Sequence, residues 1–484
     1  METTSNPALA PELARRVRGP VLTPGRDGYD EETAGFNLAA ERRPPLVLGA
    51  TGPEDVRAAV GFAAERGLRL AVHATGHGAG LPVADGLLVS TRRMDGVRVD
   101  PRTRTARIGA GTRWHRVIEA AARHGLAPLN GSSPLVGAVS YTLGGGLPVL
   151  GRTFGWAADR LRSVDIATPA HGPVTAAPDR HTDLYWALRG GGTGYGAVTA
   201  VEIGLVPLAG LYGGGLYFPG ASAERVLTAW WEWTGTIPEA MNTSIALLNL
   251  PDAPGVPEPL RGRPVVHVRI AHVGRPEAGE ALVGPLRALG PRLLDTVARM
   301  PVTSIAAVHD DPTEPMPYDE RSLMLGPLDT GALSALLERA GTGLVMVELR
   351  HLGGALGRRP DPAGPFDAIA HRGASYSLAT LAAVPGPGAI GSGVHGPGAP
   401  GSGAPGSGVP GSGAPGPYEA AALLDRMAPW GTGRRFANFL GGPRAAFLAC
   451  EAYTPDVLTR LAAVKDAYDP DHLLPAAHLT GSHL

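Results

Sequence analysis

A strand–helix–strand pattern over residues 46–75 constrains the fold of this 484-residue chain more than any other feature. The apolar run 46–50 predicts a short strand. Pro53, with Thr51 and Glu54 in capping-box spacing, predicts that a helix begins directly afterwards. The helix is expected to pack through one apolar face, formed by Val56, Ala59, Val60 and Ala63.

Gly67 is placed to end this helix. Residues 68–75 then predict a buried second strand, so His77 lies in the loop that follows it, between Gly76 and Gly78. A histidine between two glycines has almost no side-chain cover. This arrangement indicates that its ring is presented to a group that approaches the backbone closely.

Two further segments are rich in glycine. Residues 130–161 carry too many glycines for a regular helix or strand, but they are apolar enough to lie against a large planar cofactor. Residues 162–176 predict a hairpin, and residues 183–207 predict a helix, a glycine loop and a strand. The loops lack the dinucleotide fingerprint G-x-G-x-x-G, although their bare N–H groups are suited to cradling a pyrophosphate.

Metal binding and nucleophilic serine chemistry are both disfavoured. His73 and His77 are four residues apart, but a glycine-rich turn separates them and no carboxylate or cysteine is near in the sequence. No G-x-S-x-G elbow surrounds Ser132, Ser133 or Ser140. His77 remains as the candidate nucleophile, because a neutral imidazole can attack an activated methyl group.

Composition narrows the partners to small molecules. The net charge is −1, without the basic excess that is typical of nucleic-acid binding. Cys450 is the sole cysteine, which excludes an internal disulfide and suits a reducing cytoplasm. There is no signal-peptide pattern and no apolar run of about 18 residues that could cross a membrane. We expect a cytoplasmic protein, and the oligomeric state stays open.

The sequence changes in character after about residue 208. Residues 222–236 predict a helix, and the alternating runs 264–274 and 343–354 predict strands of an antiparallel sheet with one wet face. The predicted division is a cofactor domain over 19–207, a substrate domain over 208–384, a disordered low-complexity insertion over 385–417, and a segment over 430–478 that returns to the first domain.

The segment "PLVLGATGPEDVRAAVGFAAERGLRLAVHATGHG" resembles the start of the flavin domain in berberine-bridge-enzyme-like oxidases. These are FAD-linked flavoproteins of the vanillyl-alcohol-oxidase type, also described as PCMH-type, and the likeness points to their 6-hydroxynicotine-oxidase branch. Residues 131–161, 183–203, 352–378 and 435–474 fit later segments of the family. The resemblance implies an α+β fold: an FAD-binding domain plus an antiparallel-sheet substrate domain covered by helices.

The resemblance also assigns His77 as the covalent ligand of the flavin 8α-methyl group, with backbone contacts from Thr75, Gly76 and Gly78. Ser133 stands where many members carry a second, cysteinyl link, so FAD would be bound through His77 only. Val136 occupies a position associated with oxygen access, which favours an oxidase. The remaining flavin-contacting positions are Gly137, Gly144, Gly145, Val198 and Asn438.

The family's catalytic tyrosines are absent. Phe436 and Leu147 occupy their positions, and a phenyl ring cannot accept a proton. The candidates for a catalytic base are Tyr141, Glu348, His351 and Tyr376. Glu348 and Arg350 share a strand face, which is equally consistent with an active site and with simple exposure to solvent.

The resemblance implies an FAD-dependent oxidase that removes a hydride from a carbon bearing O–H or N–H in a small molecule and passes electrons to O2. A secondary-metabolite tailoring step would suit it. Alternatives are a redox-neutral cyclase that keeps the flavin, an FAD dehydrogenase with another acceptor, and a small-molecule binding protein without flavin.

Overall fold

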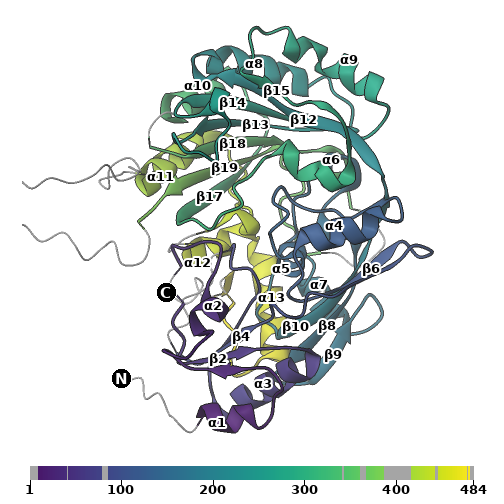
Figure 1. Cartoon of the computed structure of the whole chain (residues 1–484), viewed down its shortest axis with the longest axis vertical. Coiled ribbons are helices and arrows are strands. Elements are labelled where there is room, and N and C mark those ends of the chain that lie inside the picture. The colour runs from purple at the N-terminus through teal and green to yellow at the C-terminus, as the bar shows by residue number, and fades with distance from the viewer. Residues whose placement is uncertain are drawn as a thin grey trace, which may run out of the picture.

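The computed structural model describes residues 9–40, 42–78, 85–340, 343–359, 367–385, 416–441, 445–476 and 478–479. Most of the predicted disordered insertion therefore lies outside the described residues. Its last two residues, however, belong to a helix, α11 (Gly416–Met427). Within the described part, no helix is long and apolar enough to cross a membrane. Figure 1 shows two bodies of sheet and helix, one above the other.

The lower body contains the predicted strand–helix–strand unit. Strands β2 (Leu46–Gly49), β4 (Leu87–Ser90) and β3 (Leu70–His73) run parallel, and β1 (Val21–Leu22) pairs antiparallel with β2. Helix α3 (Pro53–Arg66) buries the predicted apolar face and ends at Gly67, whose φ of 60° is left-handed. Short helices α1 (Leu9–Ala14) and α2 (Tyr29–Thr33) precede this sheet.

Two local predictions for this unit are wrong. The helix has Gly52 as its N-cap without a side-chain cap, because the Thr51 hydroxyl donates instead to Asp55 Oδ2 at 2.7 Å. Strand β3 is not fully buried. It lies at the edge of its sheet, and Val72 is 36% exposed.

A five-stranded antiparallel sheet packs beside this unit, in the order β5-β6-β10-β8-β9. Its strands are β5 (Val97–Asp100), β6 (Thr105–Gly109), β10 (Ala197–Gly204), β8 (Leu161–Thr168) and β9 (Gly172–Ala176). The hairpin prediction is confirmed by β8 and β9, and α7 (Thr182–Ala187) confirms the helix that precedes β10. Helix α4 (Trp114–Ala122) and the short pair β7 (Leu126–Ala127) and β11 (Val206–Pro207) complete this region.

The glycine-rich stretch 130–161 does contain regular structure, contrary to expectation. Two short helices form there, α5 (Ala138–Leu143) and α6 (Gly151–Phe154). Glycines occupy the turns around them, including Gly145 and Gly146, which both have positive φ. Four apolar or aromatic residues of α5, together with Thr142, are buried and anchor this stretch in the core.

The upper body is an antiparallel sheet in the order β15-β12-β14-β13-β18-β19-β17, with β16 also paired to β12. The strands are β12 (Gly210–Pro219), β13 (Met241–Asn249), β14 (Pro264–His272), β15 (Leu294–Asp295), β16 (Ala298–Pro301), β17 (Tyr318–Leu325), β18 (Met346–His351) and β19 (Tyr376–Ala383). One face is apolar and is covered by helices (Figure 1), which are α8 (Ala223–Thr234), α9 (Pro276–Arg287), α10 (Thr330–Ala340) and α11.

The other face of this sheet is polar, but it is not wet as the alternation predicted. The strand register places Ser244 opposite both Arg269 and Arg350. Two residues along β18, Glu348 shares their face and is only 1% exposed. The alternating pattern correctly shows two different faces. It cannot show that the polar face is buried.

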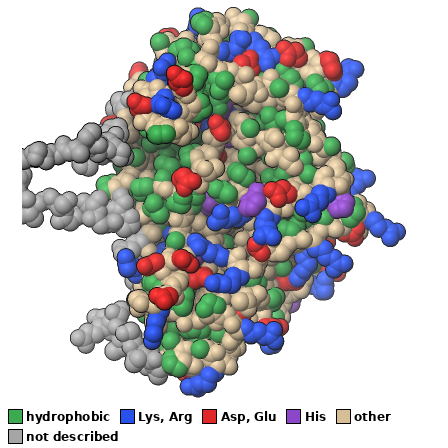
Figure 2. All heavy atoms as spheres, in the orientation of Figure 1, with side chains coloured by type: hydrophobic (Ala, Val, Ile, Leu, Met, Phe, Trp, Pro, Cys, Tyr) green, Lys and Arg blue, Asp and Glu red, His purple; other side chains and the backbone are tan. Residues whose placement is uncertain are grey.

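The C-terminal segment contacts the lower body. Helix α13 (Pro455–Tyr468) packs against α7, and Lys465 Nζ donates to the carbonyl of Gly194 at 2.6 Å. The backbone N–H of Leu70 donates to the carbonyl of Leu473 at 2.8 Å. The short helix α12 (Ala445–Leu448) precedes α13. On the surface drawn in Figure 2, side chains of Lys and Arg are interspersed with those of Asp and Glu.

Candidate active site

The loop that carries His77 is fixed from both sides. The backbone N–H groups of Phe36 and Asn37 donate to the carbonyls of Thr75 and Gly76, each at 3.0 Å. From the upper body, Tyr318 Oη donates to the carbonyl of His77 at 2.7 Å. A glycine is needed at position 76, where φ is +64° and a Cβ would lie 2.5 Å from the Cα of Gly35. The histidine is therefore held at the junction of the two bodies.

The His77 ring is oriented with one nitrogen left over. It stacks on Phe36, with ring centroids 4.1 Å apart, and Nδ1 lies 2.9 Å from Thr75 Oγ1. Nε2 is buried and has no hydrogen-bond partner among the described residues. Burial, with a smaller effect of the Arg113 charge, lowers the pKa of His77 to about 4. The imidazole is therefore neutral near pH 7, and in the tautomer whose Nδ1–H donates to Thr75 Oγ1, Nε2 carries a free lone pair.

The start of α5 lies beside this loop. A Cβ at Gly137 would be 3.4 Å from Thr75 Oγ1, so two predicted flavin-contacting positions are brought together. In the preceding loop, the half-buried Ser133 accepts a hydrogen bond from the N–H of Leu135 at 3.3 Å. The Val136 carbonyl accepts one from Trp114 at 3.1 Å. Among the described residues, a Cβ at Gly78 would meet no atom within 4 Å.

Tyr141 occupies a slot between glycines. A Cβ at Gly131 or Gly146 would lie 2.8 Å or 2.4 Å from its ring, and Trp114 contacts the ring edge-on. The hydroxyl is buried without a partner among the described residues. Burial raises its pKa far above the ordinary tyrosine value, although the Arg350 charge opposes this. Tyr141 is thus suited to donate a hydrogen bond, and it is a poor proton acceptor.

Asn438 lies beside two other predicted flavin-contacting positions, Gly144 and Gly145. Its Nδ2 donates to the carbonyl of Tyr141 at 2.8 Å, and its Oδ1 lies so close to Gly144 that a Cβ there would be 1.9 Å away. Gly145 follows, in a left-handed conformation beside Phe436. Val198, on β10, lies in the same hydrophobic cluster as Tyr141. No described contact places Val198 at His77.

Phe436 is fully buried against Trp156 in a small apolar cluster that also holds Leu147 and Met324. The two positions where relatives carry tyrosines thus form part of a hydrophobic wall. Neither Phe436 nor Leu147 offers a proton-accepting group, although the neutral imidazole of His371 packs against Trp156 and Phe436.

Glu348 is the centre of an ionic cluster on the polar face. Its carboxylate accepts hydrogen bonds from Arg269, from Ser244 Oγ at 2.9 Å and from Arg350 Nε at 2.9 Å, and His309 lies 3.6 Å away. Burial alone would raise the pKa of Glu348, but the charges of Arg350 and Arg269 outweigh it and hold the pKa well below its usual range. Glu348 is therefore a permanent carboxylate.

Tyr376 is not brought to this face. Its hydroxyl shares a hydrogen bond of 2.8 Å with Thr234 of α8, and its ring packs in the apolar cluster under the helices. It borders a second cavity of about 450 Å³, which shares Arg152 and His351 with the smaller cavity lined by Arg269 and Arg350. The structure thus groups Tyr141 and Glu348 through Arg350 and leaves Tyr376 elsewhere.

Sequence reasoning missed several residues of the polar face: Arg269, His309, Tyr318 and Glu320. The signal for Arg269 was present, because the alternating run 264–274 places it on one face with His267. A small cavity between the two bodies is lined by Arg269, His309 and Arg350 from above and by Leu147, Val149 and Arg152 from below. The site therefore forms where both bodies contribute side chains.

Comparisons with known proteins agree with this arrangement. Residues 44–177 match the family model described as an FAD binding domain. Over 80% of each chain, the sequence is 27% identical to (R)-6-hydroxynicotine oxidase of Paenarthrobacter nicotinovorans. The crystal structure of 6-hydroxy-D-nicotine oxidase from Arthrobacter nicotinovorans superposes with a TM-score of 0.78 at 22% identity, covering 96% of this chain and 97% of that one. A berberine-bridge-enzyme-like protein of Physcomitrella patens gives a TM-score of 0.79 at 19% identity, covering 98% and 100%.

The fold and its FAD-binding domain define the protein as an FAD-linked oxidoreductase. Its sequence and fold are similar to those of 6-hydroxynicotine oxidase, and its fold also matches those of berberine-bridge-like and carbohydrate oxidases. The residues present suit FAD. The unpartnered Nε2 of His77 is a ready attachment atom, and small residues line the adjoining loops.

Proposed function

We propose that this protein is an oxidase that holds FAD through one covalent bond from His77 Nε2 and oxidises a small organic molecule at a carbon bearing O–H or N–H. The observation that carries the proposal is the neutral imidazole at the junction of the two bodies, which stacks on Phe36 and whose Nε2 has no hydrogen-bond partner among the described residues. When bound, FAD accepts a hydride equivalent from such a carbon and passes its electrons to dioxygen.

The covalent bond would replace one C–H bond of the flavin 8α-methyl group, and the two electrons released would pass to dioxygen. Thr75 would position the ring for this bond through its hydrogen bond to Nδ1. Ser133 would add no second link, since a hydroxyl cannot form the thioether that a cysteine forms.

The polar face of the upper sheet would bind the substrate. Arg350 and Arg269 present guanidinium groups held in place by Glu348, and Tyr141 supplies an unpartnered hydroxyl from below. These groups can hydrogen-bond the polar atoms of a substrate while the reacting carbon faces the flavin. The name of the relative (R)-6-hydroxynicotine oxidase favours an amine, and a cytoplasmic role in secondary metabolism is part of the same proposal.

Dioxygen as the acceptor is supported by the small, partly buried Val136 next to Gly137. The absence of the family's tyrosines at Phe436 and Leu147 favours the competing possibility that the flavin serves a redox-neutral cyclisation. A dehydrogenase with another acceptor is the remaining alternative.

Acid precipitation of the purified protein tests the covalent bond. We expect yellow colour in the pellet of the wild type and in the supernatant, or absent, for His77→Ala. His73→Gln is the matched control. His73 is the last residue of β3, the strand that precedes the His77 loop, but its Nε2 already contacts the carbonyl of Glu32 at 2.7 Å. A wild-type pellet without colour would refute the covalent link.

Anaerobic mixing with an amine, (R)-6-hydroxynicotine, and with a sugar, xylobiose, tests the redox step. Bleaching of the flavin band by either probe, followed by recovery of the band and peroxide formation when air is admitted, is the expected result. Bleaching that air does not reverse would identify a dehydrogenase. An intact flavin band in the presence of a compound that the protein nevertheless converts would identify the redox-neutral alternative.

A further inference from the structure

Glu320 is an acidic side chain on the polar face that no neighbouring group neutralises. It lies on β17, two residues after Tyr318, and side chains two residues apart on a strand point to the same face. The Tyr318 hydroxyl contacts the carbonyl of His77, so this face of β17 continues directly from the attachment point of the flavin. Among the described residues, the hydrogen bonds of Glu320 are those of its backbone to Gly441, and its carboxyl takes part in no described ion pair.

The C-terminal segment borders Glu320 on its other side. The backbone N–H of Glu320 donates to the carbonyl of Gly441 at 3.0 Å, and that of Gly441 donates back at 2.9 Å. A Cβ at Gly441 would lie 3.2 Å from the Glu320 Cβ. Three residues earlier, Asn438 contacts Gly144 and Tyr141. Glu320 thus lies between His77 and the segment in which relatives carry their tyrosine.

The charges around Glu320 favour its neutral form. Burial raises the pKa of the carboxyl to about 8. Arg350 lowers it, while Asp311, Glu348 and Asp319 raise it. No described ion pair joins Arg350 to Glu320, and the Nε of Arg350 is bonded to Glu348. A carboxyl group that titrates near neutral pH can both take up and release a proton during turnover.

We propose that Glu320 is the proton acceptor of the reaction. As the substrate carbon gives its hydride, with two electrons, to FAD, the O–H or N–H proton of the substrate passes to the Glu320 carboxylate, and a C=O or C=N bond forms. Glu320 then releases this proton to solvent before the next turnover. The inference rests on the proposed function, because it needs a flavin to take the hydride.

The other acidic and phenolic groups of the site fit this role less well. Glu348 is held as a carboxylate by two guanidinium groups, so its low pKa makes it a weak base. Tyr141 has a pKa far above neutrality and remains protonated. Glu320 alone combines a free carboxyl with a pKa near 8 among the groups described on this face.

The first test is the pH dependence of the flavin absorbance in the holoenzyme, which needs no substrate. We expect a spectral transition with a midpoint near pH 8 in the wild type, its loss in Glu320→Gln, and its retention in Glu314→Gln, a matched variant of an exposed glutamate on the loop before β17. A transition that survives in Glu320→Gln, or that is absent from the wild type, overturns the proposal.

The second test is thermal unfolding of the same three proteins between pH 5 and pH 9. A carboxyl whose pKa is raised in the folded state stabilises the fold below its unfolded pKa, and this contribution is lost as the pH rises toward 8. The Tm of Glu320→Gln should therefore rise relative to the Tm of the wild type as the pH increases. A difference that does not change with pH overturns the raised pKa even in protein without flavin.

The rate of anaerobic flavin bleaching, measured with the probe that bleaches the wild type, should fall by about 100-fold or more in Glu320→Gln, with covalent flavin retained. A variant that bleaches at the wild-type rate refutes Glu320 as proton acceptor and leaves the oxidase intact. Wild-type protein without flavin refutes the proposed function itself, and the two failures are thereby distinguished.

Discussion

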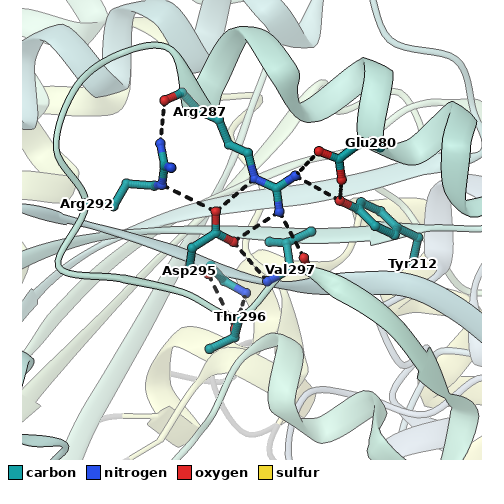
Figure 3. A network of polar contacts seen from close by, with 8 residues as sticks. Tyr212, Glu280, Arg287, Arg292, Asp295, Thr296 and Val297 are labelled. Carbon is teal, nitrogen blue, oxygen red and sulfur yellow. Dashed lines mark hydrogen bonds and ion pairs between the residues drawn. The ribbon is translucent and has the colours of Figure 1, made fainter.

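The upper body holds two arginine–carboxylate clusters, a peripheral one around Arg287 and a central one around Glu348. They differ in how many of their polar atoms have no hydrogen-bond partner. In the peripheral one, all three nitrogens of Arg287 donate: to Asp295 at 2.8 Å and 3.2 Å, to Glu280, to Tyr212 Oη at 3.0 Å and to the Val297 carbonyl at 2.9 Å. Figure 3 shows how this network joins α9 to the edge strands of the sheet. It ties secondary structure together and leaves the Arg287 guanidinium no donor nitrogen without a partner.

In the central cluster, hydrogen bonds are complete only around the Glu348 carboxylate. At its margin lie buried polar atoms without partners among the described residues, including Tyr141 Oη, both ring nitrogens of His309 and Nε2 of His77. Native proteins rarely leave such atoms unbonded unless a ligand or water satisfies them. The peripheral cluster has one such atom among the described residues, Arg292 Nε, and it lies 3.3 Å from the counter-charge of Asp295. The two clusters contain the same residue types and differ in how many unsatisfied groups they carry.

The largest expected effect comes from removing the central carboxylate. Glu348→Gln leaves Arg269 and Arg350 buried without their counter-charge, so we expect a loss of about 3–5 kcal/mol in the free energy of unfolding in urea at pH 7. Glu280→Gln, which removes an exposed partner of Arg287, should lose less than about 1 kcal/mol. Equal losses would show that the two clusters do not differ in burial energetics.

The pH dependence of the stability difference between the wild type and Glu348→Gln sharpens this prediction. The folded-state pKa of Glu348 is depressed, so its contribution to stability is present above the unfolded pKa and is lost as the pH falls through the folded pKa. The stability difference between wild type and Glu348→Gln should consequently shrink in acid. Urea midpoints from pH 7 down to the most acidic pH at which the wild type still folds would measure it.

The peripheral cluster should matter for stability alone. Arg287→Ala removes five hydrogen bonds from a side chain that is 20% exposed, and we expect a loss of about 1–3 kcal/mol in the free energy of unfolding. The flavin content and the rate of anaerobic bleaching should stay at wild-type values. A variant that unfolds normally but bleaches slowly would place function in the network of Figure 3 and weaken the comparison.

Local sequence signals located the His77 loop but not its surroundings. The glycines beside His77 and the helix stop at Gly67 act over a few residues, and both appear where expected. The Thr51 cap failed because Asp55, in the same short segment, competes for the hydroxyl. Such competition is decided by geometry that spacing alone does not contain.

The proton-accepting residue could not be predicted because its meaning depends on distant partners. In the sequence, Glu320 belongs to the run "YDERSLML", whose charges look like those of an exposed strand. It becomes part of a site only when Gly441 and the His77 loop are brought to the two sides of β17. Tyr376 shows the converse, since the sequence makes it a candidate for the catalytic base but its side chain lies under the helices.

The smallest expected effect on stability comes from two matched tyrosines. Tyr141→Phe removes a buried hydroxyl that has no described partner, so the free energy of unfolding should stay within about 1 kcal/mol of the wild type or increase. Tyr212→Phe removes a hydroxyl bonded to Arg287 and Glu280, and it should lose about 1 kcal/mol. Flavin bleaching should show the opposite order, with Tyr141→Phe slowed and Tyr212→Phe unchanged. If Tyr141→Phe is destabilised and bleaches normally, then its hydroxyl is satisfied within the folded protein, and unsatisfied groups do not distinguish the functional cluster from the structural one.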